Sequence, residues 1–570
     1  MTGGTGAEAG TGAGTAAGAG DRAASGAPLA GGESPAAIFA ARAAMTPEAP
    51  FLAHRPAPGA AFEDVSCAAL AARVASLRAA YAAGGWGAGH RAALLIGSRP
   101  DFFAHYLALN GLGVSIVPLN ADGRAEDLGW QVAHARAGTV IAAPALAPLA
   151  RDTARAAAEE GAGAVPVADA AGDLRDLPPA PRPAAPGAGG ARDEAAILYT
   201  SGTTGRPKGC VLENRYFALG GRAYAGWGGR LALAAGDRLL NPLPLHHMNA
   251  LSITTTALML TGGCAVLVDR FSPSGWWRDC TEGRASLIHY LGVMPALLLA
   301  RPPAAEDRAH AVTRGVGAGV DPDHHAAFEA RFGFPLLELW GMTETGRGFI
   351  DADEPRAVGT RAFGRPGFPL LGRVLDETGA EAPRGTPGEF QVRAAGPEPR
   401  AGFFARYLDN PDATAEAWTA DDWFRTGDVV IHGEDDRFRF VERRKNIIRR
   451  SGENIAAAEV EACLQSHDAV ASAAVLAHPD KLREEEIYAC VVLREGLTGD
   501  AALARTLFDW CDARLSYFKA PGWLAFRDAL PVTGTQKVQK GAIFASGEDP
   551  EAAAHDFRDL KRRTRKEPTP

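Results

Sequence analysis

The sequence has few cysteines, and its seven are scattered, at positions 67, 210, 264, 280, 463, 490 and 511. No two of them form a Cys-x-x-Cys pair. Neither a zinc site nor a disulfide framework is therefore indicated, and we expect a reducing, cytoplasmic location.

The chain also lacks a long uninterrupted apolar run. Residues 1–35 are mostly Gly, Ala, Ser and Thr, so they contain no signal-peptide core and are expected to be disordered. The longest apolar stretch, residues 251–268, is interrupted by threonines and by the pair Gly262-Gly263. It predicts a buried helix followed by a strand rather than a membrane span.

Basic residues are not in excess: Lys and Arg number 59, Asp and Glu number 67, and the net charge is −8. This balance argues against general nucleic-acid binding. Hydrophobic residues at 46% and charged residues at 22% are ordinary for a globular protein. At 570 residues the chain is too long for one ordinary core, so two or more domains are expected.

From Ala36 onward, helix-like and strand-like runs alternate, which is typical of an α/β fold. The expected elements are a helix at 69–82, a strand at 91–96, a helix at 101–111 and a strand at 114–120. Residues 171–194 are rich in Pro, Gly and Ala and predict a surface connector.

Residues 199–209 read Tyr-Thr-Ser-Gly-Thr-Thr-Gly-Arg-Pro-Lys-Gly and follow the strand-like run 195–198. Glycines allow a tight turn, hydroxyl residues add donors, and Arg206 and Lys208 add positive charge, so the string predicts a cradle for polyphosphate. A Walker A loop needs Ser or Thr directly after its lysine, and here Gly209 follows. The remaining alternative is a flexible surface turn.

Two further segments suggest chemistry. Prolines in residues 241–250 prevent regular structure and present His246 and His247, which could equally cap a turn. Residues 336–346 read as a strand ending in a turn that projects Thr343 and Glu344. A hydroxyl can bond a phosphate oxygen, and a carboxylate beside polyphosphate implies an intervening cation such as Mg²⁺.

These strings, with others further along, resemble the motifs of the adenylate-forming superfamily, which includes acyl-CoA synthetases, peptide-synthetase adenylation domains and beetle luciferases. They occur in the family order over residues 199–540, and weaker similarity reaches back to about Ala36. The later strings are Trp423-Phe-Arg-Thr-Gly-Asp428, the basic run in 442–455, and Leu530-Pro-Val-Thr-Gly-Thr-Gln-Lys537. Several motifs in order are far more specific than one.

The resemblance implies a large, multi-subdomain N-terminal α/β domain and a small, mobile α+β C-terminal domain. The expected boundaries are a disordered 1–35, an N-terminal domain at 36–442, a C-terminal domain at 443–547 and a charged tail at 548–570. Within the C-terminal domain we expect a helix at 456–466 and strands at 471–476 and 487–493.

The resemblance also implies roles for individual residues. Lys537 corresponds to the family's catalytic lysine, although Gln536 stands where Gly is usual. Lys445 falls on the interdomain hinge, Glu344 on the magnesium ligand, and His246 and His247 on the acid pocket. Thr343, Glu344 and Lys208 are implied in catalysis. The implied nucleotide-binding residues are Thr200, Ser201, Gly202, Thr203, Thr204, Gly205, Lys208, Gly317, Ala318, Trp340, Gly341, Met342, Thr343, Asp428 and Arg443.

The implied function is that of an ATP-dependent, AMP-forming carboxylic acid–CoA ligase that uses ATP, Mg²⁺ and CoA. A carboxylate attacks the α-phosphate of ATP to give an acyl-adenylate and pyrophosphate, and a thiol then displaces AMP to give the thioester. Residues 246–303 most resemble carnitine/crotonobetaine–CoA ligases and related small-acid ligases. Two alternatives stay open: an adenylation enzyme that loads a carrier protein, and a catalytically silent nucleotide-binding homologue. The acid and the oligomeric state, including a homo-oligomer, are not fixed.

Overall fold

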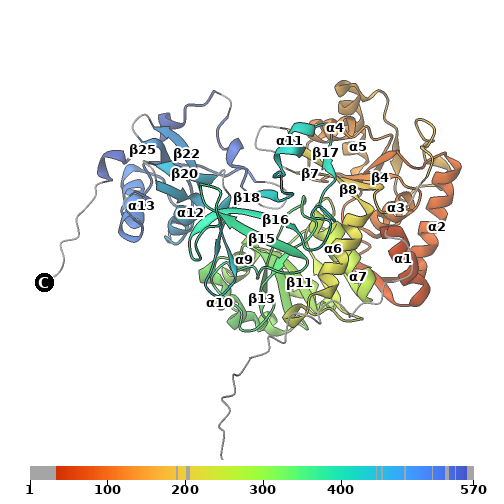
Figure 1. Cartoon of the computed structure of the whole chain (residues 1–570), viewed down its shortest axis with the longest axis horizontal. Helices are drawn as coiled ribbons and strands as arrows, with labels where there is room; N and C mark the ends of the chain where they lie inside the picture. The colour runs from red at the N-terminus through yellow and green to blue at the C-terminus, as the bar shows by residue number, and fades with distance from the viewer. Residues whose placement is uncertain are drawn as a thin grey trace, which may run out of the picture.

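The computed structural model describes residues 34–187, 190–200, 206–443, 446–450, 453–480, 483–516, 518–532, 538–545 and 547–561. The chain forms a larger body from its N-terminal and middle elements and a smaller body from its C-terminal elements, drawn in blue in Figure 1. The fold is mixed α/β, as the sequence predicts.

The first sheet has seven strands in the order β17-β8-β7-β4-β3-β5-β6. Strands β4, β3, β5 and β6 pair in parallel and β7 joins them through β4, whereas β8 runs antiparallel to β7. The strands are β3 (Arg91–Leu95), β4 (Ser115–Pro118), β5 (Val140–Ala142), β6 (Val167–Asp169), β7 (Glu194–Thr200), β8 (Lys208–Glu213) and β17 (Arg406–Tyr407). Helices near this sheet are α2 (Cys67–Ala83), α3 (Pro100–Asn110), α4 (Ala125–His134) and α5 (Ala147–Ala157).

The second sheet has eight strands in the order β14-β13-β12-β11-β9-β10-β1-β2. The strands are β1 (Pro50–His54), β2 (Glu63–Ser66), β9 (Arg238–Asn241), β10 (Cys264–Leu267), β11 (Leu287–Leu291), β12 (Arg314–Ala318), β13 (Leu336–Gly341) and β14 (Gly348–Ile350). Its six inner strands are parallel, so their carboxyl ends share one edge, where α/β proteins usually place ligands. Further helices of the larger body are α1 (Pro35–Met45), α6 (Asn214–Gly226), α7 (Thr255–Thr261), α8 (Trp276–Glu282), α9 (Val293–Leu299) and α10 (Pro322–Phe332). Of these, α7 contacts β10 and α9 contacts β11, whereas α6 contacts β8 of the first sheet.

A third, antiparallel sheet has the order β15-β16-β18-β19. Its strands are β15 (Leu370–Leu375), β16 (Pro387–Ala394), β18 (Phe424–His432) and β19 (Phe438–Arg443), and the short helix α11 (Pro411–Glu416) precedes β18. Phe390 and Phe438 pack against Phe349 and Phe363, with ring centroids 5.4 to 6.0 Å apart. This aromatic cluster joins the third sheet to the end of the second.

The C-terminal part has its own apolar core, built from residues between Ile448 and Phe557. Its sheet contains β20 (Ile447–Arg450), β21 (Glu453–Ala456), β22 (Val470–Asp480), β23 (Glu484–Leu493), β24 (Trp523–Phe526) and β25 (His555–Asp556), and its helices are α12 (Ala457–Gln465) and α13 (Ala501–Arg514). The division at Glu442 remains a proposal, which these separate cores support.

The charged tail expected from residue 548 is packed as far as Lys561. Strand β25 pairs with β24, and the Phe557 ring stacks on Phe508 with centroids 5.0 Å apart. Lys561 belongs to the expected charged tail, but its side chain is 0% exposed and its Nζ lies 2.5 Å from Glu486 Oε1. The environment of this lysine is therefore set by a buried carboxylate on β23, far away in the sequence, so local sequence could not reveal it.

Elsewhere the expected elements agree with the structure. Residues 251–268 form the end of a π-helix (Asn249–Thr254), helix α7 and strand β10. No helix in the described part of the chain is both long and apolar enough to cross a bilayer.

Candidate functional site

The predicted phosphate loop connects two antiparallel strands. Thr200 ends β7 and is paired directly with Lys208, the first residue of β8. Ser201, Gly202, Thr203, Thr204 and Gly205, which the sequence analysis placed in this loop, lie outside the described residues. The hairpin therefore fixes both ends of the loop by backbone pairing.

Lys208 faces an aromatic residue that the sequence analysis did not identify. Its Nζ lies 4.9 Å from the centroid of the Tyr407 ring. The Tyr407 hydroxyl in turn donates a hydrogen bond of 2.9 Å to Glu344 Oε1. Burial and the Glu344 carboxylate both raise the pKa of Tyr407, so its hydroxyl remains a donor. Tyr407 thus joins the predicted phosphate lysine to the predicted metal ligand.

Arg206 differs from the expectation that it adds charge to the cradle. Its guanidinium lies over the Trp130 ring and donates to both carboxylate oxygens of Glu160, at 3.1 and 2.8 Å. Because this pair is bidentate, the charge of Arg206 is largely compensated. Of the two basic residues predicted to contribute charge to the phosphate cradle, Lys208 is therefore the one that remains a candidate.

Thr343 and Glu344 lie in the loop between β13 and β14, which pair with each other. The Tyr216 hydroxyl donates to the Thr343 carbonyl at 2.8 Å, and the Phe404 amide donates to the Glu344 carbonyl at 2.8 Å. Glu344 is buried, whereas Thr343 is only half-buried. Met342 is half-buried and Gly341 is exposed. Two distant segments therefore hold the backbone of this loop.

Asp428 meets Trp340 and Arg443. The indole Nε1 of Trp340 donates to Asp428 Oδ2 at 2.8 Å, and Arg443 Nε lies 2.7 Å from Asp428 Oδ1. Asp428 and Arg443 are also direct partners across β18 and β19. Asp428 lies within β18, which pairs with β16 on one side and with β19 on the other.

Gly317 and Ala318 end strand β12 beside β11 and β13. A Cβ on Gly317 would lie 2.2 Å from the Tyr290 carbonyl oxygen, so only glycine fits this close approach. Ala318 is half-buried.

The exit from this strand is held by Glu338, which the sequence analysis missed. Its carboxylate accepts hydrogen bonds from the Tyr290 hydroxyl at 2.6 Å and from the amides of Gly319 and Val320 at 3.0 and 3.2 Å. Burial raises the pKa of Glu338. No local motif marks this residue, because its partners come from β11 and from the two residues that follow β12.

His246 and His247 follow β9, and their ring centroids are 4.3 Å apart. Burial lowers the pKa of His247 to about 4 and that of His246 well below its ordinary value. Both imidazoles are therefore neutral at physiological pH and can act as hydrogen-bonding groups rather than as cations.

A buried polar network lies next to this histidine segment. His289 Nδ1 is 2.7 Å from Asn249 Oδ1, and its Nε2 is 2.5 Å from the Tyr224 hydroxyl. Asn241 Nδ2 also donates to Asn249 Oδ1 at 3.0 Å. The sequence analysis did not predict the network, although Asn241 and Asn249 belong to the segment that it singled out.

The structure thus brings together two groups of predicted residues. Lys208 and Glu344 meet around Tyr407, with Thr343 next to Glu344 in the chain. Trp340, Asp428 and Arg443 meet at the end of β13. The predicted catalytic Lys537 and the predicted hinge residue Lys445 lie outside the described residues. Among those that are described, no cluster of three or more His, Cys, Asp or Glu could hold a metal by itself.

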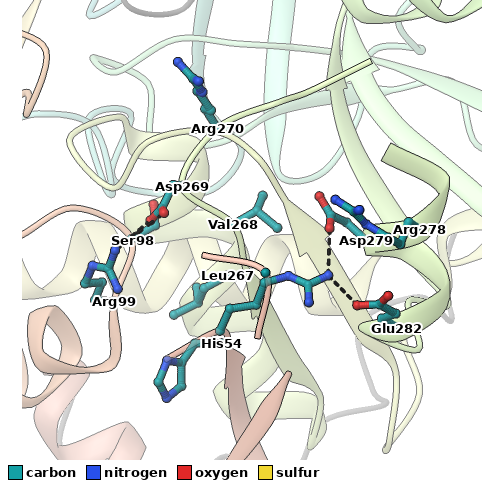
Figure 2. Close-up of a pocket in the computed structure, with 12 residues that line it drawn as sticks. His54, Ser98, Arg99, Leu267, Val268, Asp269, Arg270, Arg278, Asp279 and Glu282 are labelled. Atoms are coloured by element: carbon teal, nitrogen blue, oxygen red, sulfur yellow. Dashed lines mark hydrogen bonds and ion pairs between the residues drawn. The ribbon is translucent and has the colours of Figure 1, made fainter. Parts of the chain in front are cut away.

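A pocket of about 240 Å³ lies elsewhere, where β1, β3 and β10 end (Figure 2). Its wall includes Arg55, whose guanidinium is 2.8 Å from Asp279 and 2.7 Å from Glu282. None of the predicted nucleotide or acid residues that the structure describes lines it. It is therefore distinct from the candidate site.

Two family models match the chain: one described as AMP-binding enzyme over residues 39–399, and one described as AMP-binding enzyme C-terminal domain over residues 459–537. A sulfoacetate–CoA ligase from Cupriavidus necator is 33% identical over 519 residues, covering 89% of this chain and 96% of the relative. A crotonobetaine/carnitine–CoA ligase from Citrobacter koseri is 31% identical over 470 residues, covering 81% and 89%.

Among solved structures, ATP-bound MatB from Rhodopseudomonas palustris aligns with a TM-score of 0.74 at 25% identity. The alignment covers 92% of this chain and 100% of that one. The first family model alone covers more than half of the 570 residues. The chain therefore belongs to the AMP-binding enzyme family, among its adenylate-forming acyl-CoA synthetases, for which ATP and CoA are substrates.

Proposed function

We propose that the chain ligates a small carboxylic acid to CoA, with the two groups of residues described above as its nucleotide site. The observation that carries this proposal is the meeting of Lys208, Tyr407 and Glu344. It places a cation, a hydroxyl donor and a carboxylate beside the predicted phosphate loop. Phosphoryl chemistry depends mainly on such positioning and charge neutralisation.

In this proposal Lys208 and the amides and hydroxyls of residues 200–205 hold the β- and γ-phosphates. Thr343 bonds the α-phosphate. The backbone of Gly317 and Ala318 and the segment Trp340–Met342 hold the adenine. Asp428 and Arg443 hold the ribose, with Asp428 accepting from its hydroxyls.

Glu344 would hold Mg²⁺ between its carboxylate and the phosphates. A single buried carboxylate suits this ion, because Mg²⁺ usually takes one or two protein carboxylates and fills its other positions with phosphate oxygens and water. Bound there, the ion would neutralise phosphate charge. Tyr407 keeps the carboxylate oriented by its hydrogen bond.

Lys537 would lie between the attacking carboxylate and the α-phosphate and stabilise charge that develops in the transition state. Lys445 would be the residue about which the C-terminal domain turns between the two half-reactions. CoA is the proposed acceptor. A cytoplasmic location is supported by the seven cysteines, all of which are buried free thiols.

For the acid we propose a small polar carboxylate of the sulfoacetate or crotonobetaine kind, because the relatives named for these acids cover most of the chain. His246 and His247 would bond it as neutral imidazoles, since burial keeps both uncharged.

The test is acid-dependent exchange of pyrophosphate into ATP, measured with sulfoacetate, crotonobetaine, carnitine and several unrelated acids. Exchange with one acid class, followed by thioester formation on adding CoA, is the expected result. Exchange without transfer to CoA would favour a carrier protein as acceptor. No exchange with any acid would favour the catalytically silent alternative. Glu344→Gln serves as the inactive control.

A further inference from the structure

Glu442 bonds groups on both sides of the predicted hinge. It lies near the end of β19 and is only 5% exposed. Its Oε1 accepts from the Arg443 amide at 2.8 Å and from Asn446 Nδ2 at 3.2 Å, and its Oε2 accepts from the Ala458 amide at 2.9 Å. Asn446 and Ala458 both follow Lys445. One side chain of the larger body is therefore bonded twice to the smaller one.

The bond to Ala458 lies at the N-terminus of helix α12, where the first amides have no acceptor within the helix. The N-cap residue is Ala456, whose side chain has no oxygen and makes no capping bond. Glu442 supplies the missing acceptor from another domain. Its negative charge also suits the positive end of the helix dipole.

The next residue, Arg443, points to the opposite side of the strand, because side chains alternate along β19. Arg443 Nε contacts Asp428 Oδ1 at 2.7 Å. Two consecutive residues thus link the predicted nucleotide site to helix α12. A movement at the end of β19 must disturb both links.

We propose that Glu442 is an interdomain latch, a positioning residue that holds α12 against β19 in the orientation seen here. Its hydrogen bonds to Asn446 and Ala458 must break before the C-terminal domain can turn. The turning itself belongs to the proposed function, on which this inference rests. The hydrogen bonds that form the latch are seen in the structure, so they can be tested by a measurement that does not depend on catalysis.

The test compares Glu442→Ala and Glu442→Gln with a matched control, Glu459→Gln. Glu459 is also a carboxylate in the first turn of α12, but it pairs with Lys519 within the C-terminal part, at 2.7 Å. Its substitution removes the same charge from the same helix end without touching β19.

The first measurement is the rate of trypsin cleavage at Arg444 and Lys445 in the full-length folded protein. We expect Glu442→Ala to raise this rate roughly 5- to 30-fold, as loss of one or two strong hydrogen bonds shifts an open–closed equilibrium by that factor. Glu442→Gln should have a smaller effect, because its amide retains one acceptor oxygen. Glu459→Gln should behave like the parent.

The second measurement compares single-turnover pyrophosphate release with thioester formation. The ratio of the two rates should change in Glu442→Ala by a similar factor and stay constant in Glu459→Gln. Equal cleavage of Glu442→Ala and parent, or equal effects in Glu442→Ala and Glu459→Gln, would overturn the latch. If the parent forms no adenylate, the proposed function fails, and the cleavage comparison alone decides the latch. Should the alanine variant not fold, the glutamine variant decides.

Discussion

At the scale of single residues, Asp428 is a carboxylate that is only 1% exposed and lies between two polar partners. A buried carboxylate is costly unless it is paired, and here Trp340 and Arg443 supply a hydrogen bond and an ion pair. Both partners are themselves predicted nucleotide residues. A substitution at Asp428 therefore also removes a contact of Trp340 and of Arg443.

We expect Asp428→Ala to weaken ATP binding about 10- to 100-fold, because it removes charged hydrogen bonds and leaves Arg443 without this carboxylate. Since ribose contacts are made before and during the reaction, the rate at saturating ATP should fall less than the affinity. Titration calorimetry on the folded variant measures this. Equal ATP affinity in variant and parent would remove Asp428 from the site.

Lys537→Ala should lower adenylate formation by about a hundredfold or more while ATP binding stays intact, because the lysine is proposed to act in the transition state. The matched control is Lys540→Ala, which removes a nearby lysine that pairs with Glu461 at 2.8 Å. Pyrophosphate exchange and ATP titration on both variants give the comparison. An unchanged exchange rate in Lys537→Ala would contradict the assignment.

At the scale of elements, the network around His289 ties strand β11 to the segment that carries His246 and His247. His289 is 0% exposed, and burial lowers its pKa to about 3. In the unfolded chain a histidine binds a proton below its ordinary pKa of about 6.5. The folded state is therefore favoured above that value and loses stability as the pH falls toward 3.

His289→Gln should remove the part of the pH dependence of folding stability that His289 causes. Between pH 7.5 and 5, the parent should lose about 2 kcal/mol more unfolding free energy than the variant. Urea denaturation at the two pH values measures the difference. The variant itself should be less stable at pH 7.5, because Tyr224 and Asn249 lose their shared partner. If parent and variant lose the same unfolding free energy between the two pH values, protonation of His289 does not account for the pH dependence.

The C-terminal segment gives a second prediction at this scale. Glu486 lies between Lys561 and Arg450, and all three side chains are buried. Lys561→Met should lower the unfolding free energy of the C-terminal part by about 3 kcal/mol, the lower end of the usual cost of breaking a buried pair, because Arg450 still compensates Glu486. Lys519→Met, in a more exposed pair, should cost under about 1 kcal/mol. Equal denaturation midpoints for parent and Lys561→Met would show that the pair is not stabilising.

At the scale of the whole molecule, the proposed reaction needs two arrangements of the same domains. The first half-reaction requires Lys537 in the site, and the second requires it withdrawn so that CoA can enter. A few backbone dihedrals at a hinge can absorb such a rotation. The two cores are separate, so the domains can turn without unpacking either.

Lys445→Pro should separate the half-reactions, because proline fixes φ and removes an amide donor. If the locked geometry is the adenylating one, pyrophosphate release persists while thioester formation falls by at least about tenfold. Single-turnover assays of both steps, on protein shown to be folded, measure this. If both steps fall by the same factor, or neither changes, Lys445 is not the hinge.

Much of the fold and of the candidate site could be predicted from local sequence. The helix at 69–82 and the strands at 91–96 and 195–198 were correct, because apolar periodicity records which face is buried. The phosphate loop and the Trp-Gly-Met-Thr-Glu string were recognisable because the residues of each are consecutive in the chain. The family comparison confirms the resulting class of enzyme.

Only the tertiary structure decided which polar groups meet. Tyr407 reaches Glu344 because β17 pairs with β8, and no spacing in the sequence announces that pairing. From the sequence, Lys561 is expected to belong to a charged tail, and only the structure shows that it pairs with Glu486. The sequence by itself determined the reaction class and many of the helices and strands, because motifs and apolar periodicity each involve only a few consecutive residues. Long-range strand pairing determined the contacts, since it depends on the packing of the entire chain.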